Sequence, residues 1–140
     1  MTALERWLLW LSGGVTTATG FVYLWMKYAP TSPDPYSVVN HPLQPLVLKL
    51  HIVAAPFLVF ALGVFTVRHM WPQLTSDHPV ARRSGVTTAL VAAPMIVTGY
   101  LIQVLTDEGW LRDVAWSHIG LGTLFALGFA LHRLAARRKD

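Results

Sequence analysis

Residues 46–67 read LVLKLHIVAAPFLVFALGVFTV, an apolar run that contains a single lysine and a single histidine. At ~1.5 Å per residue, a helix of this length crosses the ~30 Å hydrocarbon core of a bilayer. A buried strand would be much shorter. The stretch therefore predicts a membrane-spanning helix.

Three further stretches have a similar length and apolar character. With the first, they predict helices over residues 7–26, 46–67, 84–105 and 114–134. Of the 140 residues, 54% are hydrophobic and 13% are charged, so the apolar surface exceeds what a small soluble core can hide. We expect an all-α fold: one integral membrane four-helix bundle over residues 1–140, with up-down-up-down topology.

The basic residues are distributed unevenly between the two ends of these helices. Eight of the eleven lysines and arginines fall on one side of the four-span arrangement: Arg6, Arg68, Arg82, Arg83, Arg133, Arg137, Arg138 and Lys139. By the positive-inside rule, both termini then lie in the cytoplasm. The net charge of +4 is then explained by basic residues on the cytoplasmic side of a protein embedded in membrane lipid, and no nucleic-acid partner is expected. A multi-pass protein of the bacterial inner (cytoplasmic) membrane is the expected location.

The chain has no cysteine, which excludes disulfides, thiolate metal sites and iron–sulfur clusters. Six histidines are the main chemical signal, because ionisable groups at membrane depth are costly and usually functional. His51 lies about five residues inside the external end of the second helix, and His118 about four inside that of the fourth. The two are predicted at nearly the same depth, where they can face each other across the bundle.

A second pair of histidines is predicted at the cytoplasmic ends of the same helices. His118 and His132 are fourteen residues apart, which at ~100° per residue restores the direction to within about 40° and rises ~21 Å. His51 and His69 are eighteen apart, which restores the direction almost fully but gives a rise of ~27 Å, so this pair is matched less well in depth. Polar caps at the interface are an equal alternative for His69 and His132. His41 and His78 lie beside prolines and are interpreted as exposed turn residues.

The two halves of the chain share a faint likeness. The matching segments are residues 19–20 with 98–99, both Thr-Gly, and residues 50–52 (LHI) with 117–119 (SHI). An ancestral duplication makes His51 and His118 equivalent positions, and a chance match within apolar sequence is the alternative.

Three glycines fall near the depths of these histidines. Gly99 and Gly85 lie fourteen residues apart on the third predicted helix, at the external and the cytoplasmic depth respectively. Gly20 of the first predicted helix reaches the external depth from another wall. Glycine lets a second group approach the helix backbone, either another helix or a bound cofactor.

On these histidine and glycine spacings, the chain resembles the cytochrome b561-like class of bacterial four-helix b-type cytochromes. In that class, axial histidines on separate helices hold haem b without covalent attachment. The resemblance implies His51 and His118 as external axial ligands, and His69 and His132 as weaker candidates for a second haem. The eighteen-residue spacing on the second helix departs from the usual fourteen. Glycines in this setting give the macrocycle room, here Gly20, Gly85 and Gly99.

The expected function is electron transfer between a quinone pool and a redox partner protein or larger complex, since members of this class also anchor larger redox enzymes in membranes. Tyr100 and Gln103 are weak candidates for lining a quinone pocket. A haem-free membrane scaffold or assembly subunit, in which the histidines only join helices, is the main alternative. A small transporter or proton-conducting protein is disfavoured because the predicted spans lack buried Asp or Glu.

Overall fold

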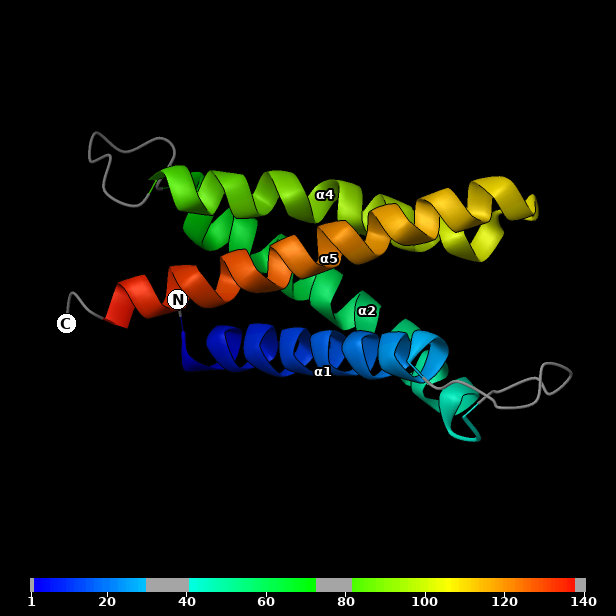
Figure 1. The fold of residues 1–140 in the computed structure, drawn as a ribbon. Helices are drawn as coiled ribbons and strands as arrows, with labels where there is room; N and C mark the ends of the chain where they lie inside the picture. The colour runs from blue at the N-terminus through cyan, green and yellow to red at the C-terminus, as the bar shows by residue number, and fades with distance from the viewer. Residues whose placement is uncertain (1, 30–40, 73–81, 138–140) are drawn as a thin grey trace, which may run out of the picture. The chain divides into compact units, whose positions relative to one another are not determined.

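The computed structural model describes residues 2–29, 41–72 and 82–137, without the side chains of residues 82–85, 88–89 and 132–137. In these ranges the chain is helical and has no strand. The elements are α1 (Ala3–Tyr28), α2 (Gln44–Phe65), the π-helix η1 (Thr66–Met70), α4 (Arg82–Val104) and α5 (Glu108–Arg137) (Figure 1). The predicted all-α class is confirmed.

Each α-helix begins before the start that the apolar pattern predicts, by two residues in α2 and α4, four in α1 and six in α5. α1 begins at Ala3 because Thr2 and Glu5 form a capping box, in which each side chain accepts from the other's backbone N–H. Proline occupies the first turn of α2, where its missing N–H costs nothing. An apolar pattern marks only the apolar part of a helix, so it does not predict these polar first turns.

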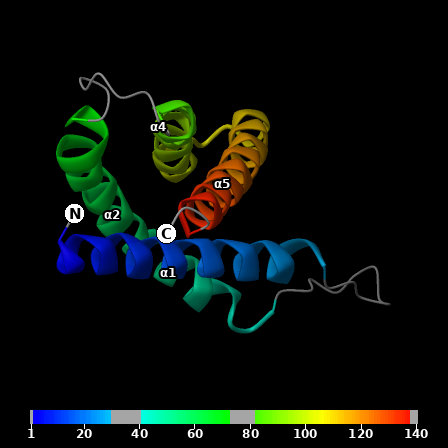
Figure 2. The same ribbon diagram turned by 90° about the vertical axis from the view of Figure 1, so that its left-hand side faces the viewer.

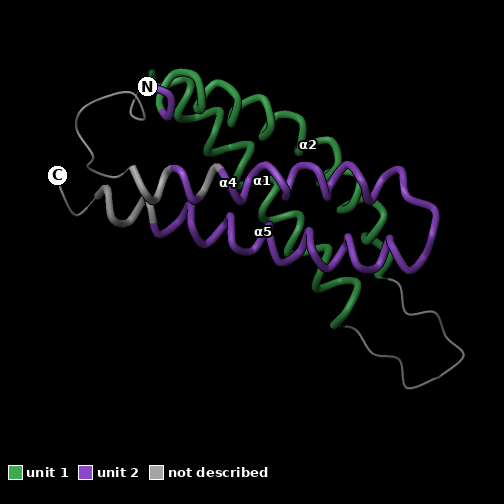
Figure 3. Tube along the Cα trace, turned by 90° about the horizontal axis from the view of Figure 1, so that it is seen from above, with its two compact units in different colours: residues 1–69 green, residues 70–140 purple. Residues whose placement is uncertain are grey.

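The chain divides into two compact units, Met1–His69 and Met70–Asp140 (Figure 3). α1 packs against α2 in the first unit, and α4 packs against α5 in the second. Only residues 105–107 separate α4 from α5, which form a helical hairpin (Figure 2). Asp107 caps α5, since its Oδ1 accepts from the Trp110 amide at 2.9 Å.

Two helical stretches are long and apolar enough to cross a membrane, Gln44–Met70 and Glu108–Leu131. They agree with the second and fourth predicted spans. The apolar part of α4 within the described residues is shorter, Leu90–Val104. α1 is long enough, but its middle carries the small and polar sequence SGGVTTATG, which lowers its hydropathy. Those same small residues allow a second helix to approach closely.

Close packing of α1 on α2 is visible at Gly13. A Cβ added there would lie 3.7 Å from Leu58 Cδ1, an ordinary van der Waals contact. Leu58 is buried, as is Phe125 in the second unit, and both lie seven residues after their unit's predicted ligand histidine. Seven residues are about two helical turns, so in each unit a buried apolar side chain lies on the face of the histidine.

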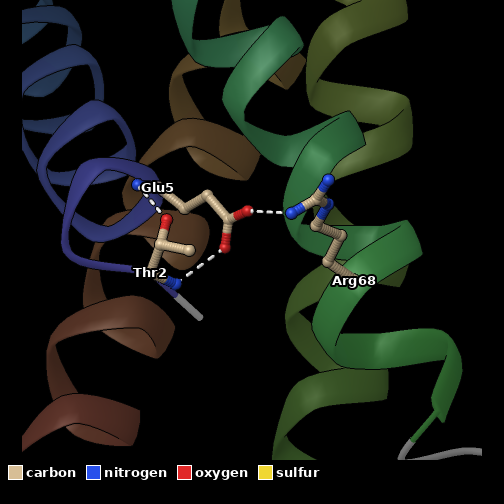
Figure 4. A network of polar contacts seen from close by, with 3 residues as sticks. All are labelled: Thr2, Glu5 and Arg68. Atoms are coloured by element: carbon tan, nitrogen blue, oxygen red, sulfur yellow. Dashed lines mark hydrogen bonds and ion pairs between the residues drawn. The ribbon is translucent and has the colours of Figure 1, made fainter.

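An ion pair joins the beginning of α1 to η1 (Figure 4). Glu5 Oε1 accepts from Arg68 Nη1 at 2.7 Å, while Glu5 Oε2 accepts from the Thr2 amide at 2.9 Å. The Thr2 backbone N–H, followed by the Arg68 guanidinium, lowers the pKa of Glu5 below its ordinary value of 4.5. One carboxylate therefore both caps α1 and holds it to the following helix.

This network predicts a specific loss of stability in acid. A carboxylate whose pKa is lowered in the folded protein stabilises it above the unfolded pKa, near 4.5, and loses that effect as the pH falls through the folded value. Thermal unfolding in detergent should show Glu5→Gln melting below wild type at pH 7, with the difference closing below pH 4.5. Asp113→Asn, which breaks an exposed pair between the neighbours Arg112 and Asp113, is the control and should melt as wild type does. An equal deficit for Glu5→Gln at both pH values would contradict the assignment.

Candidate functional site

The imidazole of His51, on α2, is hydrogen-bonded to the backbone of α1. Its Nδ1 lies 3.0 Å from the carbonyl oxygen of Thr16 and 3.2 Å from Thr19 Oγ1. A carbonyl oxygen can only accept, so this bond requires the proton on Nδ1. In the neutral form of the ring, the lone pair therefore lies on Nε2.

The hydroxyl of Thr19 also accepts from this imidazole. Its own hydrogen is directed at the backbone of α1, because Oγ1 lies 2.7 Å from the carbonyl oxygen of Val15 and 3.1 Å from that of Thr16. A hydroxyl has one hydrogen to donate and two lone pairs. With that hydrogen used within α1, the Thr19 oxygen meets His51 as an acceptor, and the Nδ1–H is shared between two oxygens.

Gly20 gives the ring its place against α1. A Cβ built on Gly20 would lie 3.0 Å from Cε1 of His51 and 3.4 Å from Nδ1. That separation is tighter than an ordinary Cβ contact, so a Cβ at this position would require the ring or the helix backbone to shift by a few tenths of an ångström.

The second unit repeats this arrangement. His118 Nδ1 lies 3.0 Å from the carbonyl oxygen of Met95 and 3.2 Å from Thr98 Oγ1. The Thr98 hydroxyl in turn donates toward the carbonyl oxygens of Pro94 at 2.8 Å and Met95 at 2.9 Å. A Cβ on Gly99 would lie 3.0 Å from His118 Cε1. His51 and His118 therefore occupy equivalent positions, as a duplication predicts.

We call each of these arrangements a histidine notch. The first notch consists of His51 with the Thr16 carbonyl, Thr19 and Gly20, and the second of His118 with the Met95 carbonyl, Thr98 and Gly99. Each is built within one unit, by a histidine of one helix and three residues of its partner helix.

The donor chemistry of a notch is compatible with binding a metal. Histidines that bind a metal commonly donate the other ring N–H to a carbonyl oxygen, which fixes the tautomer and raises the basicity of the ligating nitrogen. Among the described residues, no group of three or more His, Asp or Glu side chains could hold a metal ion. An imidazole held in this way could serve as one ligand of a metal whose other ligands come from elsewhere, such as the nitrogens of a porphyrin.

The nearest group to Gly20 and to Gly99 is an imidazole, whereas the resemblance implies a macrocycle beside these glycines. Gly20 and Gly99 make room for the imidazoles of His51 and His118. Their predicted role beside a macrocycle stays a prediction. Gly85 and His132 lie in α4 and α5, but the surroundings of Gly85 and the side chain of His132 are outside the described part of the chain, and so is His78.

His69 belongs to η1 rather than to a continuous α-helix. Its ring centroid lies 5.0 Å from that of Phe65, and the two rings are tilted by 41°. A π-helix bonds i to i+5 and therefore turns less per residue than an α-helix. The expectation that eighteen residues restore the direction of His51 at His69 assumes α-helix throughout, so it does not hold across Thr66–Met70.

His41 has the opposite tautomer. It precedes α2, and its Nδ1 accepts from the Leu43 amide at 3.2 Å, so the proton of the neutral ring lies on Nε2. This agrees with its interpretation as a turn residue, although the side chain is only partly exposed. His41 thus provides a natural contrast to the two notch histidines.

The sequence had pointed to the histidines and glycines but not to the threonine hydroxyls or the carbonyl oxygens. A carbonyl is present at every residue and carries no signal of its own. The usable signal was the Thr-Gly dipeptide, which occurs at residues 19–20 and again at 98–99.

The notches predict that glycine is needed only where the imidazole lies. Gly20→Ala and Gly99→Ala should destabilise the protein by roughly 1–3 kcal/mol, the usual cost of overpacking. Gly14→Ala is the matched control on α1, since a Cβ there meets nothing within 4 Å. Thermal unfolding in detergent measures all three. Equal melting of Gly14→Ala and Gly20→Ala would show that the ring does not need the space at Gly20.

No family model matches the chain, and no curated protein or solved structure matches it. The chemistry of the two notches and the two apolar helices are therefore the features that point to a function.

Proposed function

We propose that the chain is a four-helix membrane b-type cytochrome in which His51 and His118 ligate the iron of haem b. In this proposal it transfers electrons between a quinone and a redox partner protein or larger complex. The observation that carries the proposal is the repeated notch, in which each imidazole donates Nδ1–H to a main-chain carbonyl at 3.0 Å. That bond requires the proton on Nδ1, so Nε2 is the ring nitrogen that would coordinate the metal in this proposal.

The residues of the notches have definite tasks in this function. Bound haem supplies reversible one-electron chemistry, at a potential set by its ligands and surroundings. The carbonyls of Thr16 and Met95 hold each imidazole in one tautomer and one orientation. Gly20 and Gly99 keep each ring against its partner helix. Ligands held in this way need little rearrangement when the iron changes its charge.

The membrane setting of the proposal rests on composition and charge. Two helical stretches have the length and apolarity to cross a membrane, and large apolar side chains such as Phe57 and Phe60 of α2 and Leu124 and Leu127 of α5 are exposed. We propose that α1 and α4 complete four spans in a bacterial inner membrane. The uneven distribution of basic residues supports cytoplasmic termini.

A haem-free scaffold is the second candidate, and a specific observation favours it. Each notch histidine joins two helices of its own unit, and such hydrogen bonds stabilise membrane helix pairs without any cofactor. The two functions differ in what they require of Nε2. Only the cytochrome needs its lone pair to coordinate a metal.

Absorbance spectroscopy of the detergent-purified protein distinguishes these functions. We expect a low-spin haem b spectrum that sharpens on reduction with dithionite. Replacing either ligand by alanine, in His51→Ala or His118→Ala, should abolish the low-spin spectrum or sharply reduce it and lower the haem content. His41→Ala removes a histidine of the opposite tautomer and should leave the spectrum intact. Folded wild-type protein that takes up no haem would favour the scaffold.

Haem stoichiometry tests how the ligands are shared. One haem per chain that is lost on replacing either histidine supports His51 and His118 as ligands of a single iron. His69 and His132 enter the proposal only as candidates for a second haem. Two haems per chain in wild type, with one lost in His69→Ala, would support that second site. A spectrum unchanged when His51 and His118 are replaced together would reject their assignment as the external haem ligands.

Reporter fusions test the four-span topology. Alkaline phosphatase, which is active only in the periplasm, should be active when inserted after Thr106, between α4 and α5, and inactive when fused after Asp140. Activity after Asp140 would overturn the assignment of the C-terminus to the cytoplasm.

A further inference from the structure

We infer that Thr19 and Thr98 are positioning residues that tune the haem through its histidine ligands, an inference that rests on the proposed function. Each hydroxyl lies 3.2 Å from the Nδ1 of its histidine. Neither threonine would touch the iron, because each acts on the ring nitrogen other than Nε2. Their effect is on the electron density and the orientation of the ligand.

The direction of each hydrogen bond follows from the other bonds of the hydroxyl. Thr19 donates to its own helix, with the carbonyl oxygen of Val15 at 2.7 Å, and Thr98 does the same with that of Pro94 at 2.8 Å. Such bonds from a threonine to the carbonyl four residues earlier are ordinary in helix interiors. Because the one hydrogen points at the helix, the oxygen presents lone pairs to the imidazole.

Two acceptors for one N–H have a chemical consequence. The carbonyl oxygen at 3.0 Å and the hydroxyl oxygen at 3.2 Å both accept from Nδ1–H. Together they polarise this N–H bond, which increases the electron density of the ring. A more basic imidazole is a stronger ligand. It favours ferric over ferrous iron, because the ferric ion carries the larger positive charge. Removing the hydroxyl is therefore expected to weaken haem binding and raise the midpoint potential.

The two notches predict equal contributions from the two threonines. The distances from Nδ1 to the hydroxyl are the same in both units, and so are those from Nδ1 to the carbonyl. Thr19→Val and Thr98→Val should therefore shift the potential in the same direction and by similar amounts. The double variant should shift the potential further in the same direction than either single variant does.

The experiment compares variants that remove or keep the hydroxyl. Thr19→Val and Thr98→Val keep the side-chain shape, whereas Thr19→Ser and Thr98→Ser keep the oxygen. Loss of such an outer hydrogen bond typically costs about 10–100-fold in metal affinity, so haem titration of the full-length apoprotein should show at least the lower figure. If ferric binding weakens about tenfold more than ferrous binding, the potential rises by about 59 mV. Serine should restore both quantities toward wild type.

Thr123→Val is the matched control. Its hydroxyl lies on α5, like His118, and donates to the carbonyl oxygen of Ile119 at 2.8 Å, four residues earlier. The control loses a helix bond of the same kind while both notches stay intact, so it should keep the wild-type potential. Should a valine variant fail to fold, Thr19→Ala and Thr98→Ala remove the same oxygen without adding a methyl group at the ring.

Three outcomes separate this inference from the function on which it rests. A raised potential in the valine variants, with recovery in the serine variants, supports the positioning role. Wild-type potentials and haem affinities in both valine variants, with haem bound, overturn the inference and leave the proposed function standing. Wild-type protein that binds no haem overturns the proposed function, and the inference falls with it.

Discussion

The hydrogen bond from an imidazole Nδ1–H to a main-chain carbonyl of the partner helix is the interaction on which each unit depends. A carbonyl inside a helix already accepts an N–H from its own helix, so a second donor must approach it from the side. A Cβ on the residue four positions later would crowd that approach, since it would lie 3.0 Å from the imidazole Cε1. In both units the carbonyl, the threonine and the glycine fall at i, i+3 and i+4, which is one face of a helix.

The repetition shows which residues this geometry constrains. The accepting carbonyl belongs to Thr16 in one unit and to Met95 in the other, two residues whose side chains have nothing in common. The residue type at this position can vary because the acceptor is a main-chain carbonyl oxygen, which every residue has. The histidine, the threonine and the glycine are the same in both units, and their contributions come from the side chain: a ring N–H, a hydroxyl oxygen and a missing Cβ. Their retention in otherwise different sequences supports descent from one duplicated helical hairpin.

Much of this could be predicted from the sequence, and the rest could not for physical reasons. Apolar length predicted four helices at the right places, but missed their polar ends, which depend on caps such as Thr2 and Glu5. Depth and the cost of a polar group in lipid singled out His51 and His118. Thr19 and Thr98 were visible only as a repeat, since the direction of a hydroxyl depends on the helix opposite it. The π-helix Thr66–Met70 has no compositional signature, so the direction of His69 relative to His51 could not be predicted from the sequence.

The likeness of the two units ends where η1 begins. When His51 is aligned with His118, the position of His132 falls on Phe65, and His69 lies four residues further along. Four residues are about 6 Å of α-helix, the same mismatch that the depths of the predicted second pair show. The ring of Phe65 instead contacts His69 from the preceding turn, and Arg68 of the π-helix binds Glu5. The duplicated feature is thus the notch at one end of the helices. A second haem at the other end has no support from the repeat and has to be argued from His69 and His132 alone.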